Sequence, residues 1–453
     1  MKPTTLFAAL LCCTASMAHA QKMTKEAKYR RSSLYTMMIE DRKMTGGAEA
    51  IVVNTFSKMP TPDKYDDHCV GARIAEIDGL TISEADLKAA AELTGKGTKK
   101  GLGGLMKAAG KQVAAPEEKG KLSDNEYIAR LMKYFEQNHT ANKMIAKWYG
   151  VEDLNQANTY QFGFKLIKER GLQNASKEEL DKATLVKGGV DKIVSAAALE
   201  LIPNTFVMVT RYSYLPAEEL MAQISAYTNA IGSYLGSIGS LAGTATSLAG
   251  STLKGYFVKT TSYLFQLDWD KETQDAFEMA YADQSPQKLI DEGKYRLKYV
   301  GKTWDYAPAT LKVTLNNNHD SRLIERATVR ATDGAMAKLQ KKYDVFKTMS
   351  PLHIKGDQII AYIGKKEGLK GGEKFDVFEL IQKEDGTTEY KKTGDITAIK
   401  GKVWDNRYGT DIQSEDAASD GDEKADTDEQ LEYTLFKGNA KKLMDGMLIR
   451  QAK

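Results

Sequence analysis

Four side chains that could act as metal ligands or catalytic groups stand next to one another at Asp66, Asp67, His68 and Cys69. Consecutive side chains point in different directions, so one site would collect only about two of these four groups. The other histidines beyond residue 20, at positions 139, 319 and 353, are widely separated, and no second cysteine accompanies Cys69. We therefore predict no metal site and no cofactor for this chain.

The segment 411–432 is strongly acidic, with ten carboxylates and a single lysine, Lys424. The aspartates between Asp420 and Asp428 could attract calcium. However, Lys424 falls at a ligand position of the EF-hand pattern, and no glycine stands at the sixth position. We predict a solvated acidic loop here and no ordered calcium site.

A serine or cysteine nucleophile needs a base that a third group orients. The sequence has no G-x-S-x-G pattern. His68 and Cys69 are adjacent, and adjacent side chains rarely reach hydrogen-bond geometry. The paired carboxylates of a glycosidase are recognised only by their separation in space. We predict no catalytic residue, and a hydrolase of envelope polymers with an unrecognised site remains an alternative.

A glycine- and lysine-rich loop over residues 95–120 resembles a phosphate-binding loop in composition only. The Walker pattern requires an upstream glycine and a hydroxyl residue after the lysine, and Gly95–Gly97 lacks both. The loop has no interleaved aromatic residues for base stacking, and the formal net charge of the chain is only +3. We predict a surface loop and no nucleic-acid partner.

The longest uncharged stretch runs from Leu220 to Leu253, in a chain in which 28% of residues are charged. Glycine, alanine and serine dominate it, and small residues recur at a spacing that lets two helices approach closely. We predict an inserted pair of short helices that contacts a protein partner or another copy of the chain. Its expected interaction residues are Gly232, Gly236, Gly239, Gly243 and Gly250.

Membrane contact by residues 220–253 is the second hypothesis. Each short helix would hold roughly 12 to 15 residues, which is too few to cross a bilayer core about 30 Å thick. One continuous helix would be long enough, but its many glycines and serines make it poorly hydrophobic. Insertion into a membrane, or pore formation, therefore remains the alternative to protein contact.

The first 20 residues have the three parts of a secretory signal peptide. Lys2 supplies the basic start, Leu6–Ala15 the apolar core, and Ala18–Ala20 the A-x-A cleavage motif. The leucine that precedes Cys12 does not fit a lipidation site. We predict cleavage after Ala20 and an exported protein that is periplasmic or associated with the outer membrane.

The rest of the chain predicts an α+β fold in three parts. Residues 21–203 form a mainly helical domain, with helix caps at Ser83 and Ser123 and a long helix that ends before Gly150. Residues 204–349 mix strands with helices, and the strand-like runs Phe206–Leu215 and Tyr256–Trp269 are expected to pair around the insertion. Residues 350–453 form an all-β module, with strands expected over 358–363, 375–382, 390–392, 395–399, 401–404, 430–436 and 447–450.

The C-terminal residues 355–407 resemble the small β-barrel modules appended to bacterial envelope proteins. The resemblance is carried by Gly364, Gly368, Gly371–Glu373, Phe375, Val377 and Gly394. The segments RRSSLYTMMIE and LIPNTFVMV are similar to those of uncharacterised secreted proteins from Bacteroides-type bacteria. The resemblance implies an envelope location and no catalytic residue.

These features together predict a non-enzymatic cell-envelope protein that acts through protein–protein contact or self-assembly. The uncharged insertion is its expected contact element.

Overall fold

The computed structural model describes residues 32–39, 48–97, 122–150, 165–174, 200–216, 219–220, 222, 256–283, 295–310, 321–382, 388–409 and 431–452. The expected signal peptide, most of the Gly/Lys loop, nearly all of the acidic segment and nearly all of the uncharged insertion lie outside these residues. The five glycines expected to make contacts, Gly232, Gly236, Gly239, Gly243 and Gly250, also lie outside them.

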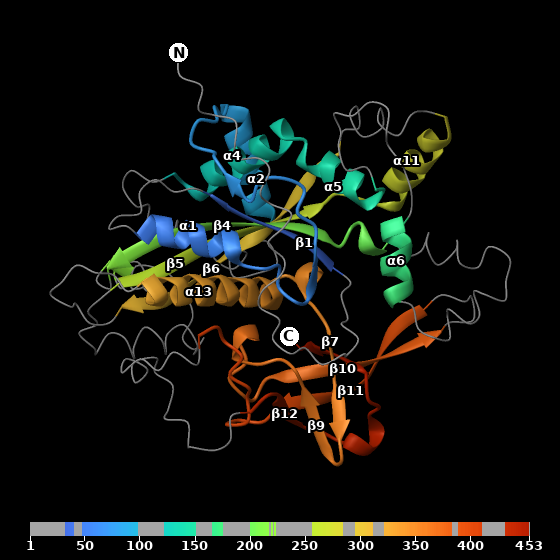
Figure 1. The fold of residues 1–453 in the computed structure, drawn as a ribbon. Coiled ribbons are helices and arrows are strands. Elements are labelled where there is room, and N and C mark those ends of the chain that lie inside the picture. Colours follow the sequence, from blue (N-terminus) through green and yellow to red (C-terminus); the bar gives the residue numbers. More distant parts are fainter. Residues whose placement is uncertain are drawn as a thin grey trace, which may run out of the picture.

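A six-stranded sheet forms the centre of the first two thirds of the chain (Figure 1). Its strands lie in the order β2 (Tyr65–Asp67), β1 (Ser32–Ile39), β4 (Thr205–Pro216), β5 (Tyr256–Leu267) and β6 (Leu297–Thr310), with β3 (Ile74–Ala75) also beside β1. Strand β1 pairs in parallel with β2, β3 and β4, whereas β5 and β6 run antiparallel to their neighbours. Nearly every residue of β1 is buried, as expected for a strand covered on both faces.

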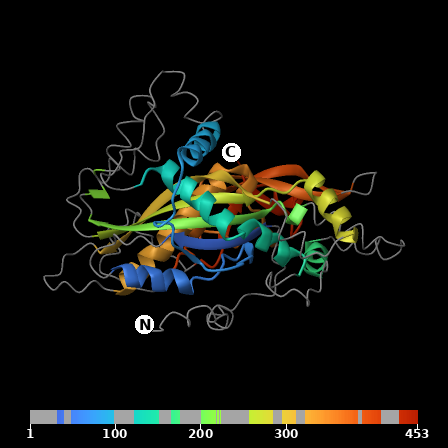
Figure 2. The ribbon, with the colours of Figure 1, turned by 90° about the horizontal axis from the view of Figure 1, so that it is seen from above.

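Helices cover both faces of this sheet. One face packs against α1 (Ala48–Lys58) and α13 (Ser321–Lys342), whose side chains share a core cluster with Met38, Tyr212 and Val258. The opposite face packs against α2 (Glu84–Gly97), α4 (Asp124–Gln137), α5 (Thr140–Trp148), α6 (Lys165–Asn174) and α11 (Lys271–Asp283). Viewed from above, the teal helices α4 and α5 follow one another across the strands (Figure 2).

The sheet crosses the boundary that we expected between residues 203 and 204. Ser33 to Ile39 of β1 pair with Thr205 to Arg211 of β4, so the expected helical domain and the expected mixed domain share one sheet. The indole Nε1 of Trp148 on α5 donates a hydrogen bond to the Thr205 hydroxyl at 2.9 Å. Strand β1 is thus an internal strand that joins both regions.

The helix expected from Ser123 to Gly150 is divided into α4 and α5. Its start is as predicted: Ser123 and Glu126 form a reciprocal capping box, with the Ser123 N–H donating to the Glu126 carboxylate at 2.6 Å. His139 then adopts φ 48°, a left-handed conformation that ends α4 and redirects the chain. Gly150 has φ 75° after α5, which agrees with the predicted glycine at the helix end.

The C-terminal region forms a nearly closed seven-stranded sheet, which confirms the expected all-β module. Its strands lie in the order β7 (Ser350–Pro351), β13 (Leu448–Gln451), β10 (Lys374–Gln382), β11 (Thr388–Ala398), β12 (Thr434–Lys437), β9 (Gln358–Ala361) and β8 (His353–Lys355). Leu352, Ile363, Val377, Ile396 and Phe436 belong to its own core, which contains no residue of the preceding sheet.

Two details of this module differ from the sequence prediction. The strands expected over 390–392 and 395–399 form the single strand β11, with a bulge in its pairing with β10 near Val377 and Phe378. Residues 401–404 form no strand, and Trp404 makes only an isolated bridge to Gly364. A bulge accommodates an extra residue in one strand, which explains why one strand resembles two in the sequence.

Candidate functional site

The side chains of Asp66, Asp67, His68 and Cys69 turn toward different partners. The His68 ring is buried, and its Nε2 donates to the carbonyl of Met144 at 2.9 Å. Burial lowers the pKa of His68 to about 3, so the imidazole stays neutral near pH 7. His68 thus fills the core beside Trp148, with ring centroids 5.1 Å apart.

The three neighbours of His68 have structural contacts of their own. Asp66 accepts from Arg170 at 2.5 Å, and Asp67 accepts from the Thr61 hydroxyl at 2.8 Å. The Cys69 thiol donates to the carbonyl of Gly71 at 3.2 Å, and burial raises the pKa of this thiol. Within the described ranges, no three His, Cys, Asp or Glu side chains are grouped closely enough to hold a metal ion.

Sequence reasoning missed the role of Arg170 in this region. Its guanidinium donates to the Ser33 hydroxyl and to Asp66, and lies over the Trp148 ring at 4.8 Å. These contacts fasten α6 to the first residues of β1 and β2. The arginine lies more than a hundred residues from both polar partners in the chain, so no local pattern could have indicated it.

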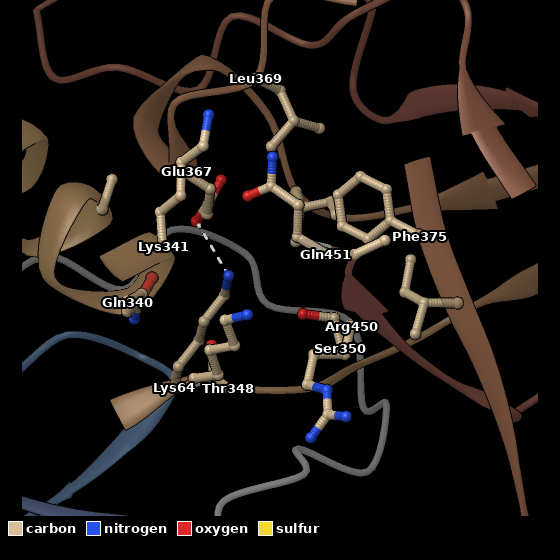
Figure 3. A pocket seen from close by; sticks show the side chains of 15 residues that line it. Lys64, Gln340, Lys341, Thr348, Ser350, Glu367, Leu369, Phe375, Arg450 and Gln451 are labelled. Carbon is tan, nitrogen blue, oxygen red and sulfur yellow. Dashed lines mark ion pairs between the residues drawn. The ribbon is translucent and has the colours of Figure 1, made fainter. Parts of the chain in front are cut away.

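A small cavity lies where α13 meets the C-terminal module (Figure 3). Its volume is about 50 Å³, room for a water molecule or two and too little for a substrate of ordinary size. The figure shows Gln340 and Lys341 of α13 on one side and Glu367, Phe375 and Gln451 of the C-terminal module around the rest.

Charged side chains at this junction are paired across it. Lys64 lies 3.7 Å from Glu367, whose second carboxylate oxygen accepts from the Gly364 N–H at 2.7 Å and from the Asn406 amide at 2.8 Å. Burial lowers the pKa of Lys64, and Glu367 opposes that effect. The satisfied carboxylate indicates that these groups hold the two parts of the protein together.

Asp333 of α13, at this junction, makes the stability of the folded protein depend on pH. Burial raises the pKa of Asp333 to about 6, with Lys366 at 4.0 Å opposing the rise and Glu367 adding to it. An unfolded aspartate titrates near 4, so between about pH 4 and 6 the folded protein holds a proton that the unfolded chain releases. The contribution of Asp333 to stability is therefore fully present below pH 4 and lost as the pH rises through 6.

We expect the Asp333→Asn variant to lack this pH dependence. Between pH 4 and 7 the unfolding free energy of the original chain should fall by about 2 to 3 kcal/mol more than that of the variant. Urea unfolding across this pH range measures the difference, and Asp395→Asn, at an exposed position of β11, is the matched control. Parallel pH profiles for Asp333→Asn and the original chain would contradict the assignment.

Comparison with known proteins gives no family for this chain. No protein-family model matches it, and no curated protein matches it. The proposed function therefore depends on the sequence and on the geometry of the described residues alone.

The two ends of the uncharged insertion are held together by a long strand pair. Strands β4 and β5 pair from Phe206 with Gln266 to Pro216 with Tyr256, so the residues on either side of the insertion lie next to each other. The rings of Tyr214 and Tyr256 stack there at 4.9 Å. This pairing agrees with the predicted strand pair around the insertion, and Leu220 is buried.

The outer edge of β6 is closed by side chains of its own chain. The Tyr343 hydroxyl accepts from the Lys302 N–H at 3.1 Å and contacts the Lys302 carbonyl at 3.2 Å. Lys338 donates to the Trp304 carbonyl at 3.1 Å, and the Tyr306 N–H donates to Asp305 at 2.9 Å. Backbone groups that are already bonded do not recruit another strand, so the middle of this edge, from Lys302 to Tyr306, is protected against strand addition.

In the part of the chain that the structure describes, no helix is both long and apolar enough to span a membrane.

Proposed function

We propose that this chain is a non-enzymatic cell-envelope protein, periplasmic or associated with the outer membrane. It acts through protein–protein contact or self-assembly, and the uncharged segment 220–253 is its contact element. The observation that carries the proposal is the β4–β5 pair, which holds both ends of the segment together at the end of a buried sheet.

Because β4 and β5 are already paired, less conformational entropy is lost when the insertion between them binds a partner. The register is unbroken from Phe206 with Gln266 to Pro216 with Tyr256, and most residues of both strands are buried. The β4–β5 pair is therefore fixed before any partner binds. Only the inserted residues then lose conformational entropy on binding. Small residues at repeated spacing then favour close packing of helices against a partner.

The described polar residues support a structural role over a catalytic one. His68, Arg170 and Glu367 are all engaged in contacts that join elements distant in sequence. The cavity at the α13 junction is too small to admit a polymer or an ordinary substrate. These observations favour a binding protein.

Deletion of Ile231–Thr252 tests the proposal. We expect the shortened chain to remain folded, because the β4–β5 pair is untouched, and to form smaller assemblies than the full mature chain. Light scattering after size-exclusion chromatography measures the molar mass of each. Deletion of residues 413–428 in the acidic segment is the control, and it should leave the number of subunits per particle unchanged.

An unchanged number of subunits per particle after deletion of Ile231–Thr252 would contradict self-assembly through the insertion. Capture of a partner protein by the full chain, lost on deletion, would then leave contact with another protein as its role. Flotation of the full chain with liposomes, also lost on deletion, would favour the membrane alternative over both.

A further inference from the structure

The cavity between α13 and the C-terminal module has a basic wall. Lys64, directly before β2, and Lys347, in the link between α13 and β7, bring two largely buried ammonium groups to it, and Lys341 adds an exposed one. Among the described residues that line the cavity, Glu367 supplies the one carboxylate. Positive charge therefore exceeds negative charge in the lining.

The ammonium group of Lys64 has only a distant ion-pair partner. A lysine carries three N–H donors, and the Glu367 oxygen that faces Lys64 is 3.7 Å from its Nζ, longer than an N–H···O hydrogen bond (Figure 3). The other oxygen of Glu367 already accepts from Gly364 and Asn406. Burial lowers the pKa of Lys64, which agrees with a charge that is not fully compensated. A second anion beside Lys64 would supply the partner that a buried charge requires.

The two other largely buried or half-buried cations of the lining are engaged in different ways. The Lys347 ammonium lies 2.8 Å from Asp344, a residue outside the lining whose side chain is 58% exposed. Its remaining N–H groups are left for the cavity. The Arg450 guanidinium lies over the ring of Phe378 at 4.8 Å, and Phe378 is not part of the lining. Lys64 and Lys347 are thus the cations that an anion in the cavity would meet.

The opposite wall of the cavity is apolar. It consists of Ile363, Leu369, Phe375 and Ile449, which all belong to the core of the C-terminal module. Leu369 and Phe375 lie across the cavity from Lys64 (Figure 3). A ligand that fits both walls has a negatively charged end and a short hydrocarbon part.

We propose that this cavity binds one carboxylate group on a short hydrocarbon stem, between the ammonium groups of Lys64 and Lys347. The volume of about 50 Å³ holds a water molecule or two, so the two carboxylate oxygens can take the places of two waters. A phosphate group, with four oxygens, needs more room. The Thr348 hydroxyl and the Gln451 amide, which also line the cavity, are further hydrogen-bond donors for these oxygens.

A ligand in this position would contact both parts of the protein. Lys64 belongs to the region of the first sheet, whereas Leu369 and Phe375 belong to the C-terminal module. A ligand that binds only the folded and docked protein stabilises it by mass action. We therefore expect acetate to raise the midpoint of thermal unfolding of the full mature chain, relative to the same concentration of acetamide.

Saturation-transfer NMR of the full mature chain with acetate tests the binding directly. We expect Lys64→Met and Lys347→Met each to raise the dissociation constant about tenfold, because each removes a charge-assisted hydrogen bond and keeps the length of the side chain. Lys400→Met, at an exposed position outside the lining, is the matched control and should bind as the original chain does. Thermal unfolding of each variant confirms its fold, and Lys347→Met serves where Lys64→Met does not fold.

Two further probes distinguish the sources of the carboxylate. Binding of N-acetylglycine, without binding of its amide, would show that the cavity accepts the carboxyl end of a chain. Binding of acetate but not of N-acetylglycine would restrict the ligand to a free small acid, which also supports the proposal. The proposal is overturned if neither acid binds, if the amide binds equally, or if chloride at equal concentration abolishes acetate binding. Unchanged binding in both lysine variants would overturn it as well.

The carboxylate site does not depend on the uncharged insertion. Its lining comes from residues 64, 337–369, 375 and 449–452, far from residues 220–253 in the chain. Deletion of Ile231–Thr252 should therefore leave acetate binding intact, even where it changes the assembly of the chain. Failure of one proposal is thus distinguishable from failure of the other.

Discussion

A fragment that ends at Pro203 is expected not to fold by itself. It would contain β1 but lack β4, to which β1 pairs from Ser33 to Ile39, and the lost sheet residues include Val207 and Val209 of the shared core. Without them, most of the apolar surface of α4 and α5 would face water, at roughly 25 cal/mol per Å². We expect the fragment 21–203 to show no cooperative urea transition by circular dichroism.

The matched control is the C-terminal module alone. The fragment 350–453 retains its own core, in which Val377, Ile396 and Phe436 pack together without side chains from the first sheet. It loses only junction contacts such as the ion pair of Glu367 with Lys64. We expect this fragment to unfold cooperatively. Cooperative unfolding of the fragment 21–203 would show that the parallel β1–β4 pair is dispensable, contrary to its central place in the sheet.

Local signals in the sequence predicted the helix starts and the strand pair around the insertion. Ser83 and Ser123 cap α2 and α4 through carboxylates three residues later, as their spacing indicated. The runs that became β4 and β5 are rich in β-branched and aromatic residues, and they pair with each other. These features depend on neighbours within a few residues, so a single sequence contains them.

The break between α4 and α5 could not be predicted in this way. It falls at His139, which carries no proline or glycine signal, and the flanking apolar positions keep helical spacing. The division lets α5 place Met144 and Trp148 over His68 and the start of β4. Tertiary packing thus sets this boundary, against the local pattern.

The contacts that hold the candidate sites together could also not be predicted from the sequence. Lys64 pairs with Glu367, and Tyr65 accepts from Gln340 at 2.8 Å, across gaps of hundreds of residues. The four adjacent groups from Asp66 to Cys69 could be expected from the sequence to point in different directions, but not which distant residues each of them contacts. His68 contacts Met144 and Asp66 contacts Arg170, both far away in the sequence.

Gly301→Ala is expected to destabilise the folded chain by about 2 to 3 kcal/mol, as overpacking of a rigid contact does. A methyl group at residue 301 would lie 2.0 Å from the Tyr343 hydroxyl oxygen and 2.1 Å from the ring carbon that bears it. That hydroxyl bonds both backbone groups of Lys302, so the methyl group would also displace the closure of the β6 edge. Urea unfolding of the full chain measures the loss.

Two controls separate the steric effect from the backbone effect at residue 301. Gly356→Ala introduces alanine at φ 61° with no atom within 4 Å of the new methyl group, so it shows what alanine costs at a positive φ without a clash, whereas residue 301, at φ 158°, also meets the Tyr343 ring. In a Tyr343→Ala background the obstructing ring is gone, and Gly301→Ala should then cost less than in the original chain. Equal costs in the two backgrounds would show that Tyr343 does not require the glycine. A reduced cost would instead identify Gly301 as the residue that admits the closing side chain, and the double variant should then expose an edge able to associate with other strands.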